Sequence, residues 1–206
     1  MKSEILHLLR HADGYVSGQQ LCETFGVSRT AVWKVINQLK EEGYVIDSVQ
    51  NKGYRITEYP DIITASEIES LLLDDSGNMQ GICRHIQYFD KTDSTNNQAK
   101  LAAEKNAPEG TLFVAECQTG GRGRRGKTWE SPAGSGIWMS LLLRPDISPE
   151  SASMLTLVLA VAMVDAINEE VQDAKCYVKW PNDIVLNNRK ISGTLTEMSA
   201  EMDSIH

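Results

Sequence analysis

The chain has 206 residues, a formal net charge of −8 and an apolar share typical of globular proteins. Its longest apolar stretch, residues 154–164, is too short to span a bilayer, and its first residues lack the pattern of a signal peptide. We therefore expect a cytoplasmic protein that contacts no membrane, rather than a secreted, disordered or membrane-spanning one.

Charge is distributed unevenly along the chain. Residues 1–60 contain seven Lys or Arg and seven Asp or Glu, so residues 61–206 carry the whole net charge of −8. Since an acidic body repels DNA phosphates, an N-terminal DNA-binding unit would need a local basic face, aided by dimerisation. The four cysteines lie far apart without a C-x-x-C pair, which favours buried, reduced thiols over a zinc site.

Three helices are predicted in the first 42 residues. Apolar residues at helical spacing mark the first helix, over residues 5–9. Ser17 begins the second helix in a capping box with Gln20, and Gly26 ends it. Ser28 caps the third helix, which runs to about residue 42 with an apolar stripe on its inner face. Two helices joined by a tight glycine-containing turn predict a helix-turn-helix.

The second helix of this motif carries side chains suited to the major groove. The candidate DNA-binding residues, between Gly18 and Asn37, are Ser28, Arg29, Thr30, Trp33, Lys34 and Asn37. Two β-prone runs, 44–49 and 53–57, follow with a turn at Asn51 and Lys52, which predicts a wing. The alternative is a helical hairpin that packs against the rest of the chain and has no role in DNA binding.

The pattern breaks at residues 58–61, where we place a domain boundary. The predicted organisation is a winged helix-turn-helix at 1–60, a linker and helix at 61–84 begun by a Thr64–Glu67 capping box, and a second domain at 85–206. Strands and helices mix in the second domain, which predicts an α+β fold with a partly antiparallel sheet. Its strands are expected at 86–89, 111–117, 137–143, 177–180, 184–186 and 191–198, and its helices at 95–105 and 148–171.

The loop at residues 118–129 concentrates glycine and positive charge. Four cations, Arg122, Arg124, Arg125 and Lys127, stand among glycines with no acidic residue nearby. Glycines let backbone N–H groups approach an anion and arginines donate to phosphate, so a polyanion site is predicted over a merely solvated loop. Residues 121–128 also match the Walker A pattern, but a P-loop runs into a helix, and the sequence that follows is a poor helix former.

Two further segments carry polar groups at the ends of predicted elements. Lys179 ends a β-run in Lys-Trp-Pro-Asn-Asp, at 179–183, where a fixed lysine could stabilise a developing negative charge. On its own, a surface lysine at the strand end is the favoured interpretation. Residues 93–96, Asp-Ser-Thr-Asn, could hold a polar ligand at a helix start, or could simply cap that helix.

Taken in this order, these segments resemble the catalytic domain of biotin protein ligases. Residues 93–96, 118–129, 179–183 and Lys-Ile-Ser-Gly at 190–193 match the run of that family. With the winged helix in front, the whole chain is similar to the bifunctional ligases that also repress the biotin operon. The resemblance therefore implies an N-terminal winged helix-turn-helix followed by a mixed-sheet ligase domain.

The resemblance implies a two-step reaction. Biotin carboxylate attacks the α-phosphate of ATP, with magnesium, to give biotinyl-5′-adenylate and pyrophosphate. The ε-amine of a lysine on a biotin carboxyl carrier domain, as in acetyl-CoA carboxylase, then attacks the adenylate. The bound adenylate also promotes a homodimer that binds operator DNA.

The resemblance also implies roles for particular residues, although it identifies no metal ligands. The catalytic residues would be Lys179, Arg122 and Arg124. Biotin would be bound by Ser94, Thr95, Asn96, Gln118, Arg122, Gly123, Arg124 and Lys179. ATP and the adenylate would be bound by Arg122, Arg124, Arg125 and Trp129.

Two features depart from the family pattern. Thr194 stands where the family has an apolar residue, and the sequence stops at His206, before a further glycine-rich strand and a small C-terminal barrel. We expect an unfinished ATP site and weak ligation by residues 1–206 alone. The main alternative is a winged-helix regulator whose second domain only senses a small molecule, although a sensor of an uncharged ligand needs no cluster of four cations. Lipoyl and octanoyl ligases share a related fold, so biotin is inferred from the motif.

Overall fold

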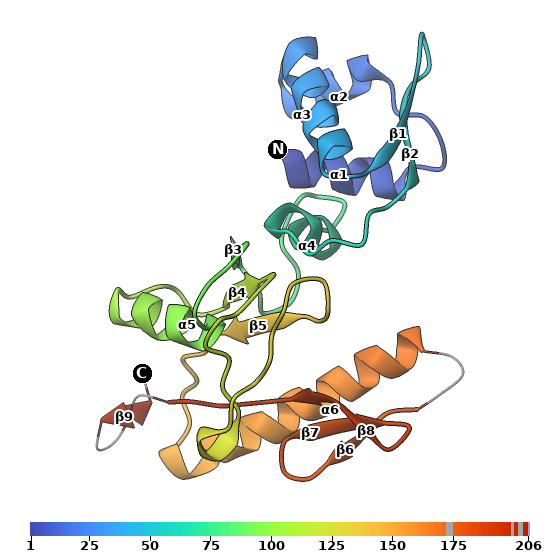
Figure 1. The fold of residues 1–206 in the computed structure, drawn as a ribbon. Helices are drawn as coiled ribbons and strands as arrows, with labels where there is room; N and C mark the ends of the chain where they lie inside the picture. Colours follow the sequence, from blue (N-terminus) through green and yellow to red (C-terminus); the bar gives the residue numbers. More distant parts are fainter. Residues whose placement is uncertain (172–174, 199, 202–203, 206) are drawn as a thin grey trace.

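The computed structural model describes residues 1–206 apart from 172–174, 199, 202–203 and 206. A helical unit with a two-stranded wing forms one end of the molecule, and α4 (Ala65–Leu72) lies between this unit and the rest of the chain (Figure 1). Beyond α4 come two three-stranded sheets with helices beside them. The predicted α+β class and the mixed character of the sheet structure are confirmed.

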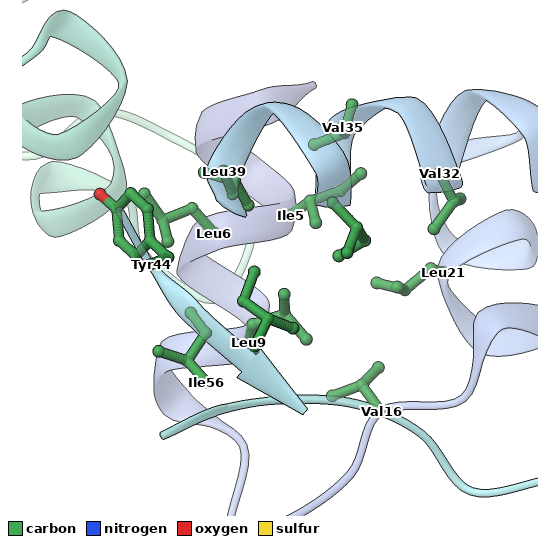
Figure 2. Packing of buried hydrophobic residues seen from close by; sticks show 12 residues of the cluster. Ile5, Leu6, Leu9, Val16, Leu21, Val32, Val35, Leu39, Tyr44 and Ile56 are labelled. Atoms are coloured by element: carbon green, nitrogen blue, oxygen red, sulfur yellow. The ribbon is translucent and has the colours of Figure 1, made fainter. Parts of the chain in front are cut away.

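The N-terminal unit packs three helices around one apolar core. They are α1 (Lys2–His11), α2 (Gly18–Phe25) and α3 (Arg29–Glu41). Figure 2 shows the inner faces converging, with Ile5, Leu21 and Leu39 completely buried. Since full burial of one such side chain stabilises a fold by about 1.5–3 kcal/mol, this cluster fixes how the helices lie against one another.

The predicted caps of α2 and α3 are confirmed. Ser17 Oγ accepts a hydrogen bond from the Gln20 N–H at 3.0 Å, and Ser28 Oγ accepts one from the Ala31 N–H at 3.2 Å. Gly26 ends α2 in the left-handed conformation. The local signals in the sequence therefore set the bounds of the helix-turn-helix.

The wing consists of β1 (Val45–Val49) and β2 (Gly53–Glu58), paired antiparallel around a turn at residues 50–52. It is joined to the start of α2, because Val16 and Tyr54 exchange two backbone hydrogen bonds of 2.9 Å. Only glycine fits at position 53, where a Cβ would lie 2.0 Å from the Val16 carbonyl oxygen. The wing is thus held close to the helices.

Helix α4 is fastened to the winged unit by polar contacts. Its predicted cap is confirmed, since Thr64 Oγ1 accepts from the Glu67 N–H at 3.2 Å. The Glu67 carboxylate reaches away from α4 and accepts hydrogen bonds from Arg10 at 2.6 Å and from the Tyr44 hydroxyl. Burial, together with this carboxylate, raises the pKa of Tyr44. Because α4 also packs against β3 (His85–Phe89), it connects the two parts of the molecule.

The first sheet places the start of one helix beside a long loop. In it, β4 (Thr111–Ala115) is central and fully buried, parallel to β3 and antiparallel to β5 (Trp138–Leu141). Helix α5 (Thr95–Glu104) connects β3 with β4 and packs against β4 and β5. The carboxyl ends of β3 and β4 share one edge, so residues 92–95 and the loop after residue 117 meet there.

The second sheet is antiparallel throughout. It consists of β6 (Tyr177–Lys179), β7 (Asp183–Leu186) and β8 (Arg189–Gly193), with the predicted turn at Asn187 and Asn188, both at positive φ. A 3-10 turn (Pro149–Ser151) leads into α6 (Ala152–Glu170), which packs against β6 and β7. Two short paired strands, β9 (Ala200–Glu201) and β10 (Ser204–Ile205), follow.

Three expectations from the sequence are wrong in part. The strand predicted at 191–198 ends at Gly193, because its partner β7 begins at Asp183 and only one further in-register hydrogen bond, from Thr194 N–H to Asn182 O at 2.9 Å, follows. The four cysteines are free, but only Cys176 is buried. The stretch Pro149–Glu170 has the length and apolar composition of a membrane span, whereas the longest apolar stretch predicted from the sequence, residues 154–164, is too short. The core helices of soluble proteins meet the same criterion of length and composition.

Candidate functional site

The loop after β4 folds back on itself as an irregular hairpin. Gln118 N–H donates to Ser131 O at 3.0 Å, and Trp129 N–H donates to Gly121 O at 2.9 Å. A side chain at position 121 would place its Cβ 2.3 Å from the Trp129 carbonyl oxygen, so the hairpin closes only on glycine. Its tip is a single 3-10 turn (Arg124–Gly126), and residues 127–137, all described, form no helix. The Walker A interpretation therefore fails, as predicted.

The arginines of this loop contact two different parts of the second domain. Arg122 donates to Asn97 Oδ1 on α5 and lies 3.9 Å from a Glu197 carboxylate oxygen. Arg124 donates to Asn182 Oδ1 at 3.0 Å, between β6 and β7. Arg125, at positive φ, and Lys127 remain exposed. The loop thus connects the first sheet with the second.

Asn182, just before β7, is hydrogen bonded to Thr194, just after β8. It is 9% exposed, and its Nδ2 donates to Thr194 O at 3.0 Å while its carbonyl accepts the Thr194 N–H. Every contact of Thr194 in this pair uses backbone atoms. The departure from the family pattern at position 194 therefore leaves the pairing intact.

The two lysines of the second sheet near Asn182 have different contacts. Lys190 Nζ lies 2.6 Å from an Asp183 carboxylate oxygen and 4.8 Å from the centroid of the Trp129 ring. Lys179, which the resemblance implied as catalytic, lies on β6 opposite Asp183, and both lysines are exposed. Lys190 is the one of the two that contacts the Gly/Arg loop, through the Trp129 ring. Sequence reasoning quoted it in a motif without giving it a role.

The loop and the second sheet enclose a cleft of about 520 Å³. Five cations and one carboxylate, Asp183, line it. Its lining residues are Arg122, Gly123, Arg124, Arg125, Lys127, Thr128, Trp129, Trp180, Pro181, Asn182, Asp183, Lys190, Gly193, Thr194 and Leu195. Lys179 is not among them. In a protein with net charge −8, such a concentration of cations is chemically suited to a polyanionic ligand.

A second group of polar residues surrounds the start of α5. Thr95 donates from its N–H and its hydroxyl to Gln118 Oε1, at 2.8 and 3.1 Å, and Gln118 Nε2 donates to Ser131 Oγ at 3.0 Å. Ser94 and Thr95 are each 3% exposed. Three of the residues predicted to bind biotin thus meet at one place, with Gln118 reaching across from the loop.

Asp93 organises the turn before α5. Ser94 occupies the cap position, but its N–H donates to the Asp93 carboxylate at 2.7 Å, and Asn97 and Gln98 donate to the same carboxylate. The hydrogen bond from Asn97, with that from the Ser94 backbone, lowers the pKa of Asp93 to about 2. The Asp93 side chain thus holds the first turn of α5 through these contacts, while Ser94, the N-cap residue, makes no side-chain capping hydrogen bond.

Two residues absent from the sequence prediction complete this group. Ser140 on β5 hydrogen bonds to Thr95 Oγ1 at 2.8 Å and donates to Asn96 Oδ1. Glu197 accepts from Asn96 Nδ2 at 2.8 Å. A hydroxyl within the apolar strand at β5 was a usable signal for Ser140. No signal in the sequence indicated Glu197, since its contact with Asn96 joins residues about a hundred positions apart.

The winged unit presents a separate polar face. Arg29, Thr30, Trp33 and Lys34 are exposed on α3, as predicted, whereas Asn37 is half-buried. A hollow of about 540 Å³ separates the starts of α2 and α3 from the wing. Its rim includes Ser17, Gly18, Gln19, Arg29, Asn51 and Lys52. Two N-terminal helix ends and two cations face this hollow, which is compatible with a phosphate backbone.

Two family models match the two parts of the chain. A family model described as the biotin/lipoate A/B protein ligase family matches residues 88–206, and a helix-turn-helix domain model matches residues 2–55. The chain therefore belongs to the biotin/lipoate A/B protein ligase family, with a helix-turn-helix domain in front of the ligase region.

Bifunctional ligase/repressors are among its relatives. The protein BirA of Bacillus subtilis (strain 168) is 43% identical over 206 residues, which make up 100% of this chain and 62% of that protein. BirA of Escherichia coli (strain K12) is 34% identical over 198 residues, which make up 96% of this chain and 58% of that protein. The solved biotin protein ligase from Aquifex aeolicus, in complex with biotin and ATP, is 34% identical with a TM-score of 0.49, over 59% of this chain and 49% of that one.

Proposed function

We propose that this protein activates biotin with ATP to biotinyl-5′-adenylate and transfers biotin to a lysine of a biotin carboxyl carrier domain. The observation that carries the proposal is the cleft in which Arg122, Arg124 and Lys190 converge. The relatives that support it are named for ligase and repressor activity. This chain spans 62% of the B. subtilis relative.

In this proposal, the cations of the cleft bind and stabilise the reacting anions. Arg122 and Arg124 donate to phosphate and carboxylate oxygens, and Arg125 and Lys127 add positive charge at the mouth. Lys190, fixed by Asp183, stabilises the charge that develops as biotin carboxylate attacks the α-phosphate. Lys179, opposite Asp183 in the β6–β7 pairing, is proposed to act beside it in the catalytic role that the resemblance implies. Trp129 offers an aromatic face to the adenine.

Biotin itself is assigned to the start of α5. Ser94, Thr95, Asn96 and Gln118 supply buried hydroxyl and amide groups there, and Gly123 lets the loop approach the ligand. Within the described residues, no group of three or more His, Cys, Asp and Glu side chains could hold a metal ion. The magnesium of this proposal therefore accompanies the phosphates of ATP, as Mg²⁺ commonly does, and no step is derived through it.

The winged unit is proposed to bind operator DNA as part of a homodimer in the cytoplasm. Seven cations and seven carboxylates cancel over residues 1–60, so one copy would bind weakly. Replacing Arg29 or Lys34 with alanine should weaken operator binding and flatten its salt dependence, measured by fluorescence anisotropy. Unchanged affinity in both variants would remove α3 from the DNA interface.

Ligand-dependent thermal stabilisation tests the ligase proposal. The chain is heated with biotin, with biotin plus ATP and magnesium, and with lipoate as the control, while adenylate is assayed by thin-layer chromatography. A biotin-specific rise of the midpoint, or adenylate formation, supports the proposal. No response from this chain or from a chain of the relatives' length would exclude it.

A further inference from the structure

Glu197 lies where three segments of the ligase region meet. Four residues beyond β8, its carboxylate accepts from Lys100 Nζ at 2.7 Å and from Asn96 Nδ2 at 2.8 Å, and Arg122 lies 3.9 Å away. Its side chain is 24% exposed. Although partial burial raises the pKa of Glu197, the hydrogen bonds from Lys100 and Asn96 outweigh it and lower that pKa. The carboxylate is therefore ionised at neutral pH.

This carboxylate determines which way the Asn96 amide points. A carboxylate can only accept, so Asn96 must turn Nδ2 toward Glu197, and Nδ2 also lies 3.4 Å from Leu195 O. The amide oxygen then faces Ser140, whose hydroxyl donates to it. Since Ser140 also hydrogen bonds to Thr95, the orientation of Asn96 is linked to the buried polar group at the start of α5.

The same carboxylate attracts an arginine of the Gly/Arg loop. Among the ion pairs of the described residues, the one with Glu197 is the only pair that includes a cation of this loop. It holds Arg122 toward α5, where Asn97 also accepts from it. One carboxylate thus faces both a group assigned to biotin and a group assigned to the reacting phosphate.

We propose that Glu197 is a positioning residue of the ligase site, which orients Asn96 and holds Arg122 against α5 before biotin binds. The inference rests on the proposed function, because that function makes these two residues biotin contacts. Lys100, itself half-exposed, pairs with the carboxylate and, among the described residues, forms no hydrogen bond with Asn96 or Arg122. The site is therefore partly assembled without its ligand, which reduces the ordering that biotin must cause.

Variants of the full 206-residue chain test this role by two independent readouts. Biotin affinity is measured by titration calorimetry, and the rate at which trypsin cleaves the loop after its arginines is measured without ligand. Glu197→Ala should weaken biotin binding by about ten-fold or more, since it removes a charge-assisted hydrogen bond and an ion pair, and should accelerate cleavage. Glu197→Gln, which keeps an acceptor for Asn96, should restore much of the affinity but not the protection of the loop.

Two controls separate positioning from general stability. Glu130→Gln removes the same charge from the exposed end of the loop and should change neither readout. Lys100→Met removes the solvent-side contact and should change affinity by no more than about three-fold, because the pairing with Asn96 remains. Equal affinity and equal cleavage in Glu197→Ala and the wild type would overturn the proposal. If the wild type fails to bind biotin, the proposed function fails, while the cleavage comparison still decides whether Glu197 holds the loop.

Discussion

Replacing Glu67 with glutamine should release α4 from the winged unit. The Glu67 and Arg10 side chains are 15% and 18% exposed and their charged atoms lie 2.6 Å apart, so the substitution leaves Arg10 as a partly buried cation without its carboxylate. Removing one partner of a buried ion pair costs about 3–5 kcal/mol, and we expect about 2–3 kcal/mol here because Gln still accepts one hydrogen bond. The Tyr59 ring, 4.6 Å from the Arg10 guanidinium, retains part of the attraction.

Thermal unfolding and hydrogen exchange measure this effect. Each kcal/mol is worth about 4–8 °C in a domain of 60–100 residues, so the midpoint of the winged unit should fall by about 8 °C or more. Exchange should increase in the peptides of α1 and α4 and remain unchanged in β4. Glu69→Gln, on the same helix and without an ion pair among the described residues, is the matched control.

A double variant tests the reasoning behind this magnitude. Combining Glu67→Gln with Arg10→Met removes both charges and should recover part of the lost stability, because an absent pair costs less than an unpaired buried charge. If the double variant is less stable than Glu67→Gln alone, the loss does not come from an uncompensated Arg10. In that case packing between α1 and α4 is the dominant contribution.

Three further predictions concern the ligase site. Lys179→Met should lower adenylate formation at least about a hundred-fold and Lys190→Met should lower it as well, and activity within about three-fold of wild type in Lys179→Met would contradict its catalytic role. Asn182→Ala should weaken ATP binding about ten-fold and biotin binding less in calorimetry, because Arg124, which contacts both ligands in the proposal, loses its partner, while an equal loss of both ligands would indicate general loosening of the second sheet. Asp93 has a pKa of about 2 when folded against an ordinary value of 3.8, so its contribution to stability is present above pH 3.8 and is lost as pH falls to about 2. Asp93→Asn should flatten the decline of the melting midpoint in that range, and an identical pH profile would contradict this account.

The sequence specified the winged unit almost completely, because its signals are local. Ser17, Gly26 and Ser28 act on backbone atoms a few residues away, and the helical stripe of apolar residues defines a single core. The end of β8 was missed for the opposite reason. It depends on where the partner strand β7 begins, which no periodicity in residues 191–198 encodes, and the predicted strand ran on to residue 198.

The site was predictable in its parts and less so in its geometry. A cluster of arginines among glycines indicates an anion site wherever it folds, and the cleft contains those arginines. Lys190 could not be identified from sequence, because its contacts with Asp183 and Trp129 depend on how β7 pairs with β8 and on the fold of the loop. Lys179, which the motif did identify, lies on the same face of this sheet, opposite Asp183.

The two backbone hydrogen bonds between Val16 and Tyr54 fix the spacing between the helices and the wing. The chain between these residues contains both helices of the helix-turn-helix and the whole of β1, and two hydrogen bonds of 2.9 Å close it into a ring. The gap between the exposed face of α3 and the tip of the wing is therefore set before any duplex arrives. In the proposed complex with operator DNA, this fixed spacing would favour duplexes whose groove width matches it.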